Sequence, residues 1–398
     1  MDLKNIFEKF SGKSKIFRNR EALQARYHPE KILHRDKELE KIAAILAPSL
    51  KGEKPSNLFI YGKTGTGKTL CVLHVAKQLE EFARERKGNV RIIYVNCKLK
   101  RVADTPYRLL AHILHELGQE VPSTGLPTDE LYKAFYDLID RRSDVIILIL
   151  DEIDQLVAKS GDDILYNLSR IDSELKNARL SIVGISNDLL FAENLDPRVK
   201  SSLSEEEVVF PPYNALQIKD ILEERARIAF QQGVIGEGVI QKIAAISARS
   251  HGDARRALEL LRITGELAER KDMNKLTLEL VDEAEEKMES ENIIETIKAQ
   301  PQQYKAVLYT TITLNEKNME INTGELYNHY RRLCFQIKVR PLTQRRVSDI
   351  IAELDMQGLL SAKTINRGRY GRTKSIECTI PLRLLEHVKK ILREDLGL

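Results

Sequence analysis

The sequence predicts an α/β protein with a parallel sheet, followed by a small helical domain and a C-terminal winged helix-turn-helix. Short aliphatic runs alternate with amphipathic helical patterns over residues 1–213. Residues 214–290 carry helical patterns without strand patterns, and residues 291–398 combine helices with a basic hairpin. Because 398 residues are too many for one ordinary core, we expect these three ranges to be domains.

A glycine-rich loop follows the first expected strand, the apolar run Leu58–Tyr61. Gly62–Thr69 has the form Gly-x-x-x-x-Gly-Lys-Thr, in which glycines let backbone N–H groups approach phosphate oxygens. A helix that starts at about Lys68 turns its positive end toward the same phosphates. We expect Lys68 to contact the β- and γ-phosphates and Thr69 to ligate Mg²⁺. A plain turn between a strand and a helix is the alternative. The nucleotide-binding candidates here are Gly62, Lys63, Thr64, Gly65, Thr66, Gly67, Lys68, Thr69 and Leu70.

Further strands and amphipathic helices complete the expected nucleotide-binding domain. Val145–Leu150 is an unbroken aliphatic run, which is typical of a strand covered on both faces of a parallel sheet. The other expected elements are strands at Arg91–Asn96, Leu180–Ser186 and Glu207–Phe210, and helices at Pro106–Leu117, Asp129–Ile139 and Ile164–Leu175.

Polar side chains stand at the carboxyl ends of two of these strands. Asp151 and Glu152 follow the aliphatic run, where an acid can reach the Mg²⁺ sphere. We expect Asp151 to orient metal-bound water and Glu152 to activate the attacking water as a general base. Asn187 follows the next strand and could contact the γ-phosphate, although Asn is also a common turn residue. A surface turn after a core strand is the alternative at each position.

The segment before the first strand is the candidate wall of the base pocket. It runs through Tyr27–Asp36 into an amphipathic helix expected at Asp36–Leu46. A helix that merely caps the sheet fits the same residues equally well. The base-pocket candidates are His28, Pro29 and Ile32, together with Tyr213 at the end of the domain.

Composition excludes several classes of protein. Hydrophobic residues make up 42% and charged residues 31%, as in globular proteins, and no apolar run is long enough to span a membrane. The first residues lack the apolar core of a signal peptide. The four cysteines form no Cys-x-x-Cys pair, so a reduced intracellular protein is expected and zinc is not.

Helical patterns continue behind the sheet. Residues 214–289 suggest helices at Ile218–Phe230, Gly238–Ser247, Ala254–Arg270 and Thr277–Met288. They would form a lid over the nucleotide, with a hinge near Pro211–Asn214. Residues 289–300 are expected to be helical or a linker.

The C-terminal part carries the positive charge. Residues 301–398 hold 17 Lys and Arg against 10 Asp and Glu, whereas the remaining 300 residues hold 46 against 49. This asymmetry indicates a polyanionic partner for the C-terminal part.

The pattern in this region predicts a winged helix-turn-helix. Helices are expected at Gln303–Leu314, Thr323–Ile337 and Thr343–Leu354, with Thr343 as an N-cap, before a hairpin that runs from Leu359 to Ile380. The last helix would enter the major groove, and the basic hairpin would lie on phosphates or in the minor groove. A protein-binding winged helix with a solvated basic edge is the alternative. The DNA-binding candidates are Arg340, Gln344, Arg345, Arg346, Ser348, Arg367, Arg369, Arg372 and Lys374.

In this order the motifs resemble those of AAA+ ATPases. Gly62–Thr69 matches Walker A, Asp151 with Glu152 matches Walker B, and Asn187 matches sensor 1. Residues 195–202 are similar to the arginine-finger box, and residues 251–258 are similar to sensor 2. The resemblance implies that Arg198 reaches a neighbouring subunit's nucleotide and that Arg255 reaches the γ-phosphate in its own chain. The candidate catalytic residues are then Glu152, Asn187, Arg198 and Arg255, and the metal-site candidates are Thr69 and Asp151.

An AAA+ module followed by a winged helix is similar to the archaeal origin-recognition and cell-division-control initiators. The resemblance implies ATP/ADP and Mg²⁺ as cofactors, slow ATP hydrolysis, and binding of double-stranded origin DNA. It also implies recruitment of the replicative helicase or other initiator subunits, in a cytoplasmic, nucleoid-associated protein. A family-specific insertion would fall within Lys98–Leu117, with Lys98, Lys100 and Arg101 as phosphate contacts. The alternatives are a helicase- or clamp-loader-like ATPase that acts through protein contacts, and an ATP-switched transcription regulator.

Overall fold

The computed structural model describes residues 14–98, 105–122, 125–141, 143–191, 193–203, 205–316, 321–366 and 372–398; the side chains at 205, 365, 366, 372 and 373 are outside this description. The chain forms two compact units, Met1–Val281 and Asp282–Leu398. The division into three domains stays a prediction, and each unit is described by itself.

A five-stranded parallel sheet is the centre of the first unit. Its strands follow the order β2-β3-β4-β1-β5, so β1 lies between β4 and β5. The expected α/β class with a parallel sheet is confirmed. The strands are β1 (Asn57–Tyr61), β2 (Val90–Asn96), β3 (Val145–Asp151), β4 (Arg179–Ser186) and β5 (Glu205–Val209).

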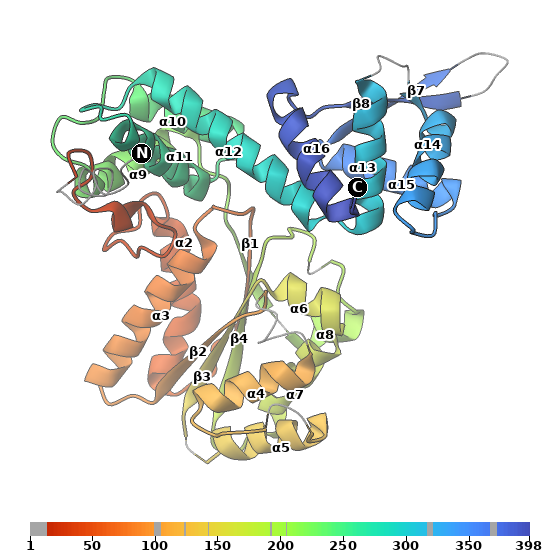
Figure 1. Cartoon of the computed structure of the whole chain (residues 1–398). Coiled ribbons are helices and arrows are strands. Elements are labelled where there is room, and N and C mark those ends of the chain that lie inside the picture. Colours follow the sequence, from red (N-terminus) through yellow and green to blue (C-terminus); the bar gives the residue numbers. More distant parts are fainter. Residues whose placement is uncertain are drawn as a thin grey trace. The chain divides into compact units, whose positions relative to one another are not determined.

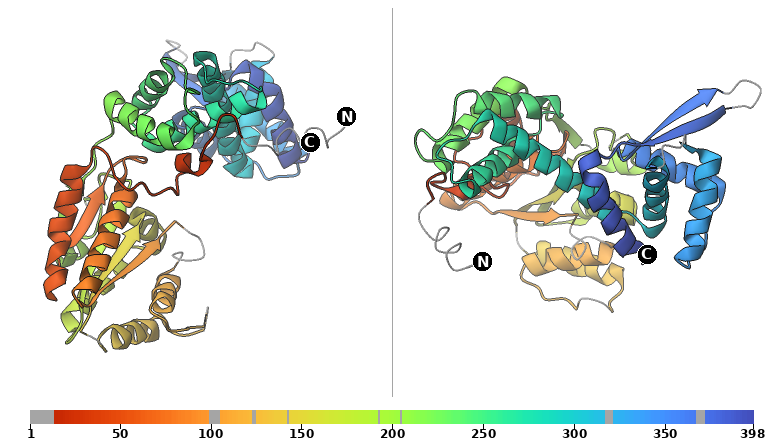
Figure 2. Two further views of the ribbon diagram at one scale, coloured as in Figure 1. Left: turned by 90° about the vertical axis from the view of Figure 1, so that its left-hand side faces the viewer. Right: turned by 45° about the horizontal axis from the view of Figure 1, so that its top comes forward.

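Helices cover both faces of this sheet, as Figures 1 and 2 show. All residues of β3 are buried, and they alternate between the two faces. Ile147 and Ile149 pack with α2 (Asp36–Leu46) and α3 (Lys68–Glu85). Their neighbours along β3 face the opposite core, which contains residues of α4 (Pro106–Glu116), α5 (Thr128–Ile139), α6 (Ile153–Ser160), α7 (Asp163–Glu174) and α8 (Pro197–Leu203).

The helical lid belongs to the same unit. An Asn214–Gln217 capping box starts α9 (Ala215–Ala229), and the Asp253 carboxylate caps α11 (Ala254–Arg270). The remaining lid elements are α10 (Val239–Arg249) and the first part of α12 (Leu278–Ala299). We expected a helix at Thr277–Met288 and then a helical or linker segment over residues 289–300. The structure instead has one continuous helix, α12, because residues 278–299 contain neither Gly nor Pro.

The first residues that the structure describes, from Ser14 onward, lie on this lid. Phe17 is buried and stacks on Phe230, with ring centroids 5.0 Å apart. The 3-10 helix η1 (Arg20–Leu23) follows, and a second 3-10 helix, η2 (Ala47–Lys51), comes directly after α2. The segment that leads to the phosphate loop therefore passes over the lid first.

The second unit has the helices and the hairpin of a winged helix-turn-helix. Leu326, Val347 and Ile350 are among the residues of its buried core. Figure 2 shows the β7–β8 hairpin extending beyond the helices of this unit. Strand β6 was not expected, because two residues leave no pattern. The elements are α13 (Gln302–Asn315), β6 (Ile321–Asn322), α14 (Thr323–Gln336), α15 (Gln344–Met356), β7 (Leu360–Asn366), β8 (Arg372–Cys378) and α16 (Leu382–Leu396), with antiparallel strand order β6-β8-β7.

Candidate functional site

The glycine-rich loop lies between β1 and α3 and is enclosed on two sides. Gly65 and Gly67 have φ angles of +76° and +92°, which disfavour other residues. A Cβ atom on Gly65 would overlap the Asp253 carboxylate, and one on Gly67 would lie 2.9 Å from the Tyr213 hydroxyl. Thr66 is buried under the loop, whereas Lys63 and Thr64 are exposed. The loop is therefore shaped by contacts with the lid and with the connection between β5 and α9.

Lys68 is buried at the start of α3, with 5% of its surface exposed. Its Nζ donates to the carbonyl oxygens of Gly62 at 2.6 Å and Lys63 at 2.9 Å. A third bond, 2.9 Å long, goes to Oδ1 of Asn187, which joins the loop to the end of β4. Burial, and to a lesser degree the nearby Arg255 guanidinium, lowers the pKa of Lys68 to about 8.

Asp151 at the end of β3 accepts hydrogen bonds on both oxygens. Its Oδ2 accepts from the Thr69 hydroxyl at 3.0 Å and from the Tyr94 hydroxyl at 2.8 Å. Its Oδ1 accepts from the backbone N–H of Glu152 at 3.0 Å. Burial, reinforced by the Asp151 charge, raises the pKa of the Tyr94 phenol, so this group remains a donor. Tyr94 was not predicted; only its place in the strand beside β3 could have indicated it.

Glu152 has a left-handed backbone conformation. Its φ of +56° is unusual for a residue with a side chain, and it lies directly before α6. Its carboxylate is 3.6 Å from Nζ of Lys98, which lies after β2. The structure thus brings a carboxylate that was predicted as a general base next to a lysine that was predicted to contact DNA.

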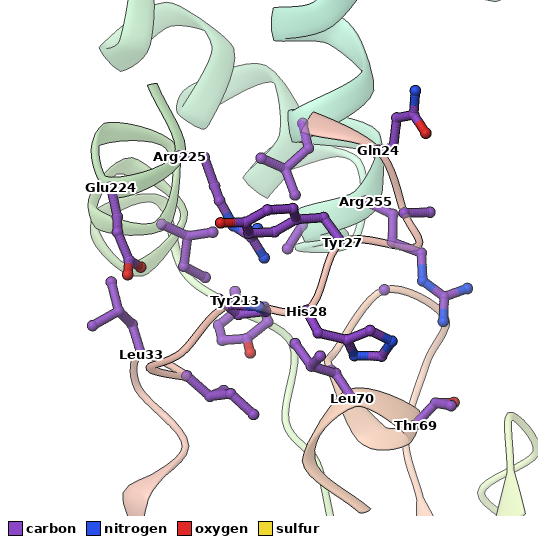
Figure 3. A pocket seen from close by; sticks show the side chains of 18 of the residues that line it. Gln24, Tyr27, His28, Leu33, Thr69, Leu70, Tyr213, Glu224, Arg225 and Arg255 are labelled. Carbon is purple, nitrogen blue, oxygen red and sulfur yellow. The ribbon is translucent and has the colours of Figure 1, made fainter. Parts of the chain in front are cut away.

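A pocket lies between the N-terminal segment, the phosphate loop and the lid (Figure 3). His28, Pro29, Ile32, Leu70 and Tyr213, all predicted for the nucleotide site, line it. The lining also includes residues that were not individual candidates, although Tyr27, Lys31 and Leu33 lie in the segment expected to wall the base pocket. They are Gln24, Ala25, Tyr27, Lys31, Leu33, Leu73, Ile221, Glu224, Arg225, Ala254 and Leu258.

Arg225 and Tyr27 form one wall of this pocket. Arg225 is buried, with its guanidinium 4.5 Å from the centre of the Tyr27 ring, and Figure 3 shows the two side by side. One nitrogen of Arg225 donates to the carbonyl of Ala22 at 3.3 Å. No short sequence motif could have indicated this pair, because Tyr27 and Arg225 are far apart in the sequence.

The two predicted catalytic arginines have different surroundings. Arg255 lines the pocket at the start of α11, next to Ala254, whose backbone N–H donates to the carbonyl of Gly65 at 3.2 Å. Arg198 is 78% exposed at the start of α8 and binds both oxygens of Asp196, at 3.0 and 3.1 Å. Arg255 therefore shares the site with Lys68, and Arg198 lies at the surface.

The DNA-binding candidates of α15 do not share one environment. Thr343 caps the helix, as expected, by accepting from the backbone N–H of Arg346. Arg346 is 3.3 Å from the Glu353 carboxylate and donates to the Tyr304 hydroxyl at 3.1 Å. Arg345 is exposed, with no acid within ion-pair distance in the part of the chain that the structure describes.

The remaining candidates are placed only in part. Arg340 and Gln344 are exposed, while Lys374 on β8 is half-buried. The Ser348 hydroxyl donates to the carbonyl of Gln344 at 3.0 Å. Lys100, Arg101, Arg367 and Arg369 lie outside the described residues, as does the side chain of Arg372.

Family models match three successive parts of the chain. Residues 51–190 match an AAA domain, and residues 219–286 match the Cdc6 AAA+ ATPase-type lid domain. Residues 295–388 match the CDC6 C-terminal winged helix domain. The expected combination of AAA+ module, lid and winged helix is confirmed.

Curated relatives are similar over nearly the whole chain. An ORC1-type DNA replication protein 1 from Methanosarcina acetivorans is 49% identical over 396 residues, which cover 99% of this chain and 94% of the relative. An ORC1-type DNA replication protein from Pyrococcus horikoshii is 51% identical over 385 residues, which cover 96% and 91%.

Solved structures agree with this similarity. The Aeropyrum pernix ORC1 protein in complex with DNA has a TM-score of 0.84 and 43% identity, with 96% of this chain and 98% of that chain covered. Cdc6p from Pyrobaculum aerophilum has a TM-score of 0.59 at 23% identity, with 96% and 100% covered, and supports the fold alone.

The described residues contain neither a helix suited to cross a membrane nor a cluster of metal-ligating side chains. None of the helices there is both long and apolar enough to cross a bilayer. Nor do three or more His, Cys, Asp or Glu side chains in that part of the chain form a group that could hold a metal ion.

Proposed function

The chain belongs to the family of ORC1-type DNA replication proteins, and we propose from this premise that it is a replication initiator that binds ATP and double-stranded origin DNA. The environment of Lys68 is the observation that supports ATP binding most directly. Each of its three hydrogen-bond acceptors in the described structure is neutral, so its buried charge is not compensated by a carboxylate at bonding distance. A phosphate group supplies that compensation.

The roles of the other loop residues follow from their positions. The Thr69 hydroxyl and the Asp151 carboxylate offer adjacent oxygen atoms, the donors that Mg²⁺ prefers, and Mg²⁺ needs few protein ligands when phosphates are present. A bound Mg²⁺ would neutralise charge on the phosphate oxygens. Tyr213, His28, Pro29, Ile32 and Leu70 would then hold the base in the pocket beside the loop.

We propose that the chain also hydrolyses ATP slowly. Glu152 would accept a proton from the attacking water, and Asn187 would orient the γ-phosphate together with Lys68. Arg255 would contact the γ-phosphate from the lid side of the pocket. Arg198, whose side chain is exposed at the surface, would act on the nucleotide of a neighbouring subunit.

The proposed DNA contacts lie on the winged helix and beside the sheet. Arg345 and Gln344 are exposed at the start of α15, where a recognition helix meets base edges and phosphates. Lys98 is 70% exposed, and Arg340 and Lys374 add positive charge. The DNA complex of the relative with 43% identity supports DNA binding by this chain. Recruitment of the replicative helicase or of other initiator subunits is proposed from family membership alone.

Equilibrium binding tests the proposal directly. The purified chain, loaded with ADP or ATP, is titrated into a labelled duplex from the origin region of its own genome and into a random duplex of equal length. We expect tighter binding of the origin duplex and weaker binding of both duplexes between 50 and 200 mM salt, ~10³-fold or more for several phosphate contacts. Equal affinity for the two duplexes, with no effect of salt, would contradict the proposal.

A further inference from the structure

We infer that Arg35 is a positioning residue that joins the phosphate loop to the connection between β5 and the lid. The inference rests on the proposed nucleotide-binding function and adds a coupling between the loop and the lid. Arg35 is 1% exposed and is among the largest fully buried side chains of the described chain. Charged side chains are rarely buried so completely unless several partners hold them.

The Arg35 guanidinium bonds to two backbone segments that are far apart in sequence. Its Nε donates to the carbonyl of Thr66, within the phosphate loop, at 3.0 Å. Its Nη2 donates to the carbonyl of Pro211, between β5 and α9, at 2.6 Å. Its Nη1 donates to the Glu38 carboxylate at 3.0 Å, which balances the charge. One planar group thus fixes two carbonyl oxygens relative to each other.

The same guanidinium also supports Tyr213 on the way to the lid. It lies 3.9 Å from the centre of the Tyr213 ring, a cation–π contact. The Tyr213 hydroxyl approaches Gly67 so closely that a Cβ there would lie 2.9 Å away. The backbone N–H of Tyr213 donates to the carbonyl of Gly252 at 3.4 Å, just before α11. Arg35 is therefore connected through Tyr213 to Gly252, which lies just before Asp253 and the first turn of α11 with Arg255.

These contacts require an arginine. A guanidinium presents five N–H donors in one plane, so it can serve two carbonyls and a carboxylate while a ring stacks on its face. A lysine ammonium keeps the charge beside Glu38 but cannot hold both carbonyls and stack at the same time. If nucleotide binding shifts the phosphate loop, the rigid Arg35 guanidinium would move with it. Pro211 and Tyr213 would then shift as well, and with them the lid.

The test compares Arg35→Lys with the wild-type chain and with Glu38→Gln. The control keeps the guanidinium, and its glutamine oxygen can still accept a bond. Amide hydrogen exchange of the full chain is measured with and without saturating ADP and Mg²⁺. In the wild type and the control, we expect ADP to protect residues 62–70, 211–217 and 252–258. In Arg35→Lys, we expect ADP to bind about tenfold more weakly and, at saturation, to protect residues 62–70 alone.

Each outcome decides the question. Wild-type protection of all three segments in Arg35→Lys would overturn the inference, even if the variant unfolds at a lower temperature, because a purely structural role changes stability and not the response to ADP. If Arg35→Lys does not fold, Tyr213→Leu replaces it: loss of ADP-induced protection at 252–258 is expected, and retention would contradict the inference. A wild-type chain that does not bind ADP would instead refute the proposed nucleotide function.

Discussion

The proposed nucleotide site and the proposed DNA-binding surface of the winged helix use positive charge in opposite ways. Lys68 and Arg35 are buried, and carbonyl, amide or carboxylate oxygens fix each of them. Arg345 on α15 is exposed, while its neighbour Arg346 bonds to Glu353 and Tyr304. Buried cations must be matched one by one, because an unpaired charge is costly away from water. Exposed cations can act together, through the electrostatic potential that they create at the surface.

This difference explains what each region can do. A fixed ammonium recognises one phosphate position, so a substitution that removes it should strongly weaken nucleotide binding. A set of exposed cations binds a polyanion with losses that are spread over many contacts. The following predictions test this contrast, from the largest effect to the smallest.

The largest effect is expected for Glu152→Gln. Loss of the proposed general base should slow ATP hydrolysis by about 10²–10⁴-fold, because the amide cannot accept the proton from water. ADP affinity should stay within about twofold, since the Glu152 carboxylate pairs with Lys98, whereas Lys68 bonds to Gly62, Lys63 and Asn187 in the described structure. Single-turnover hydrolysis and equilibrium ADP binding measure the two quantities; a variant that hydrolyses ATP at the wild-type rate would exclude Glu152 as the base.

Lys68→Ala should remove most of the nucleotide affinity. The variant loses the one buried ammonium in the loop, and we expect ADP to bind about 10²-fold more weakly. Asn187→Ala is the matched control, because it removes a partner of Lys68 and leaves the charge. Calorimetric titration of both variants should give a much smaller loss for the control; equal losses would mean that the charge is not the main determinant.

The lowered pKa of Lys68 predicts a pH dependence of binding. Below pH 8 the lysine of the free protein is protonated and can meet the phosphates directly. Above its pKa of about 8, binding must take up a proton, so ADP affinity should fall by about tenfold per pH unit. Titrations between pH 7 and 10 measure this fall, and Lys68→Arg, which stays charged, should show none. A flat wild-type profile would contradict the assigned pKa.

The lowered pKa of Lys68 also predicts that the unliganded protein becomes more stable, not less, as the pH rises above 8. Burial disfavours the charged form of Lys68 in the folded state, and this cost is present below pH 8. As the pH rises from 8 toward the unfolded value of 10.5, the contribution of Lys68 should make the free energy of unfolding increase. Urea unfolding of the wild type and of Lys68→Ala separates this contribution from other titrations, and a pH trend shared by both would exclude it.

The smallest effects should separate two adjacent arginines. Arg345→Ala should weaken duplex binding by about tenfold and reduce the slope against salt by about 1, because a free cation is lost. Arg346→Ala should weaken binding by less than about threefold, since Glu353 already holds its guanidinium. Fluorescence anisotropy over a salt series measures both, and the reverse order would show that packing does not decide which cations reach DNA.

The sequence predicted the elements that local patterns determine. The buried run Val145–Leu150 and the glycine-rich loop appear where expected because burial on both faces and backbone freedom leave clear residue patterns. The hairpin after α15 was also predicted. The unbroken course of α12 was not, because a polar helix with little apolar periodicity looks the same as a linker.

The site was predictable only as far as its motifs extend. Lys68, Thr69, Asp151 and Asn187 come together as their spacing suggested. Arg35 and Tyr94 contribute contacts that depend on how distant segments pack, and no short pattern encodes such contacts. Likewise, composition indicated a basic winged helix, but only the fold shows that an acid holds Arg346, whereas Arg345 has no acidic partner among the described residues.

Footprinting of the purified full chain on DNA near its own gene, with ATP and with ADP, tests the central claim most directly. The account predicts a defined protected element whose extent or occupancy depends on the bound nucleotide. Absence of duplex protection in both nucleotide states, from a chain that still binds ADP, would contradict it.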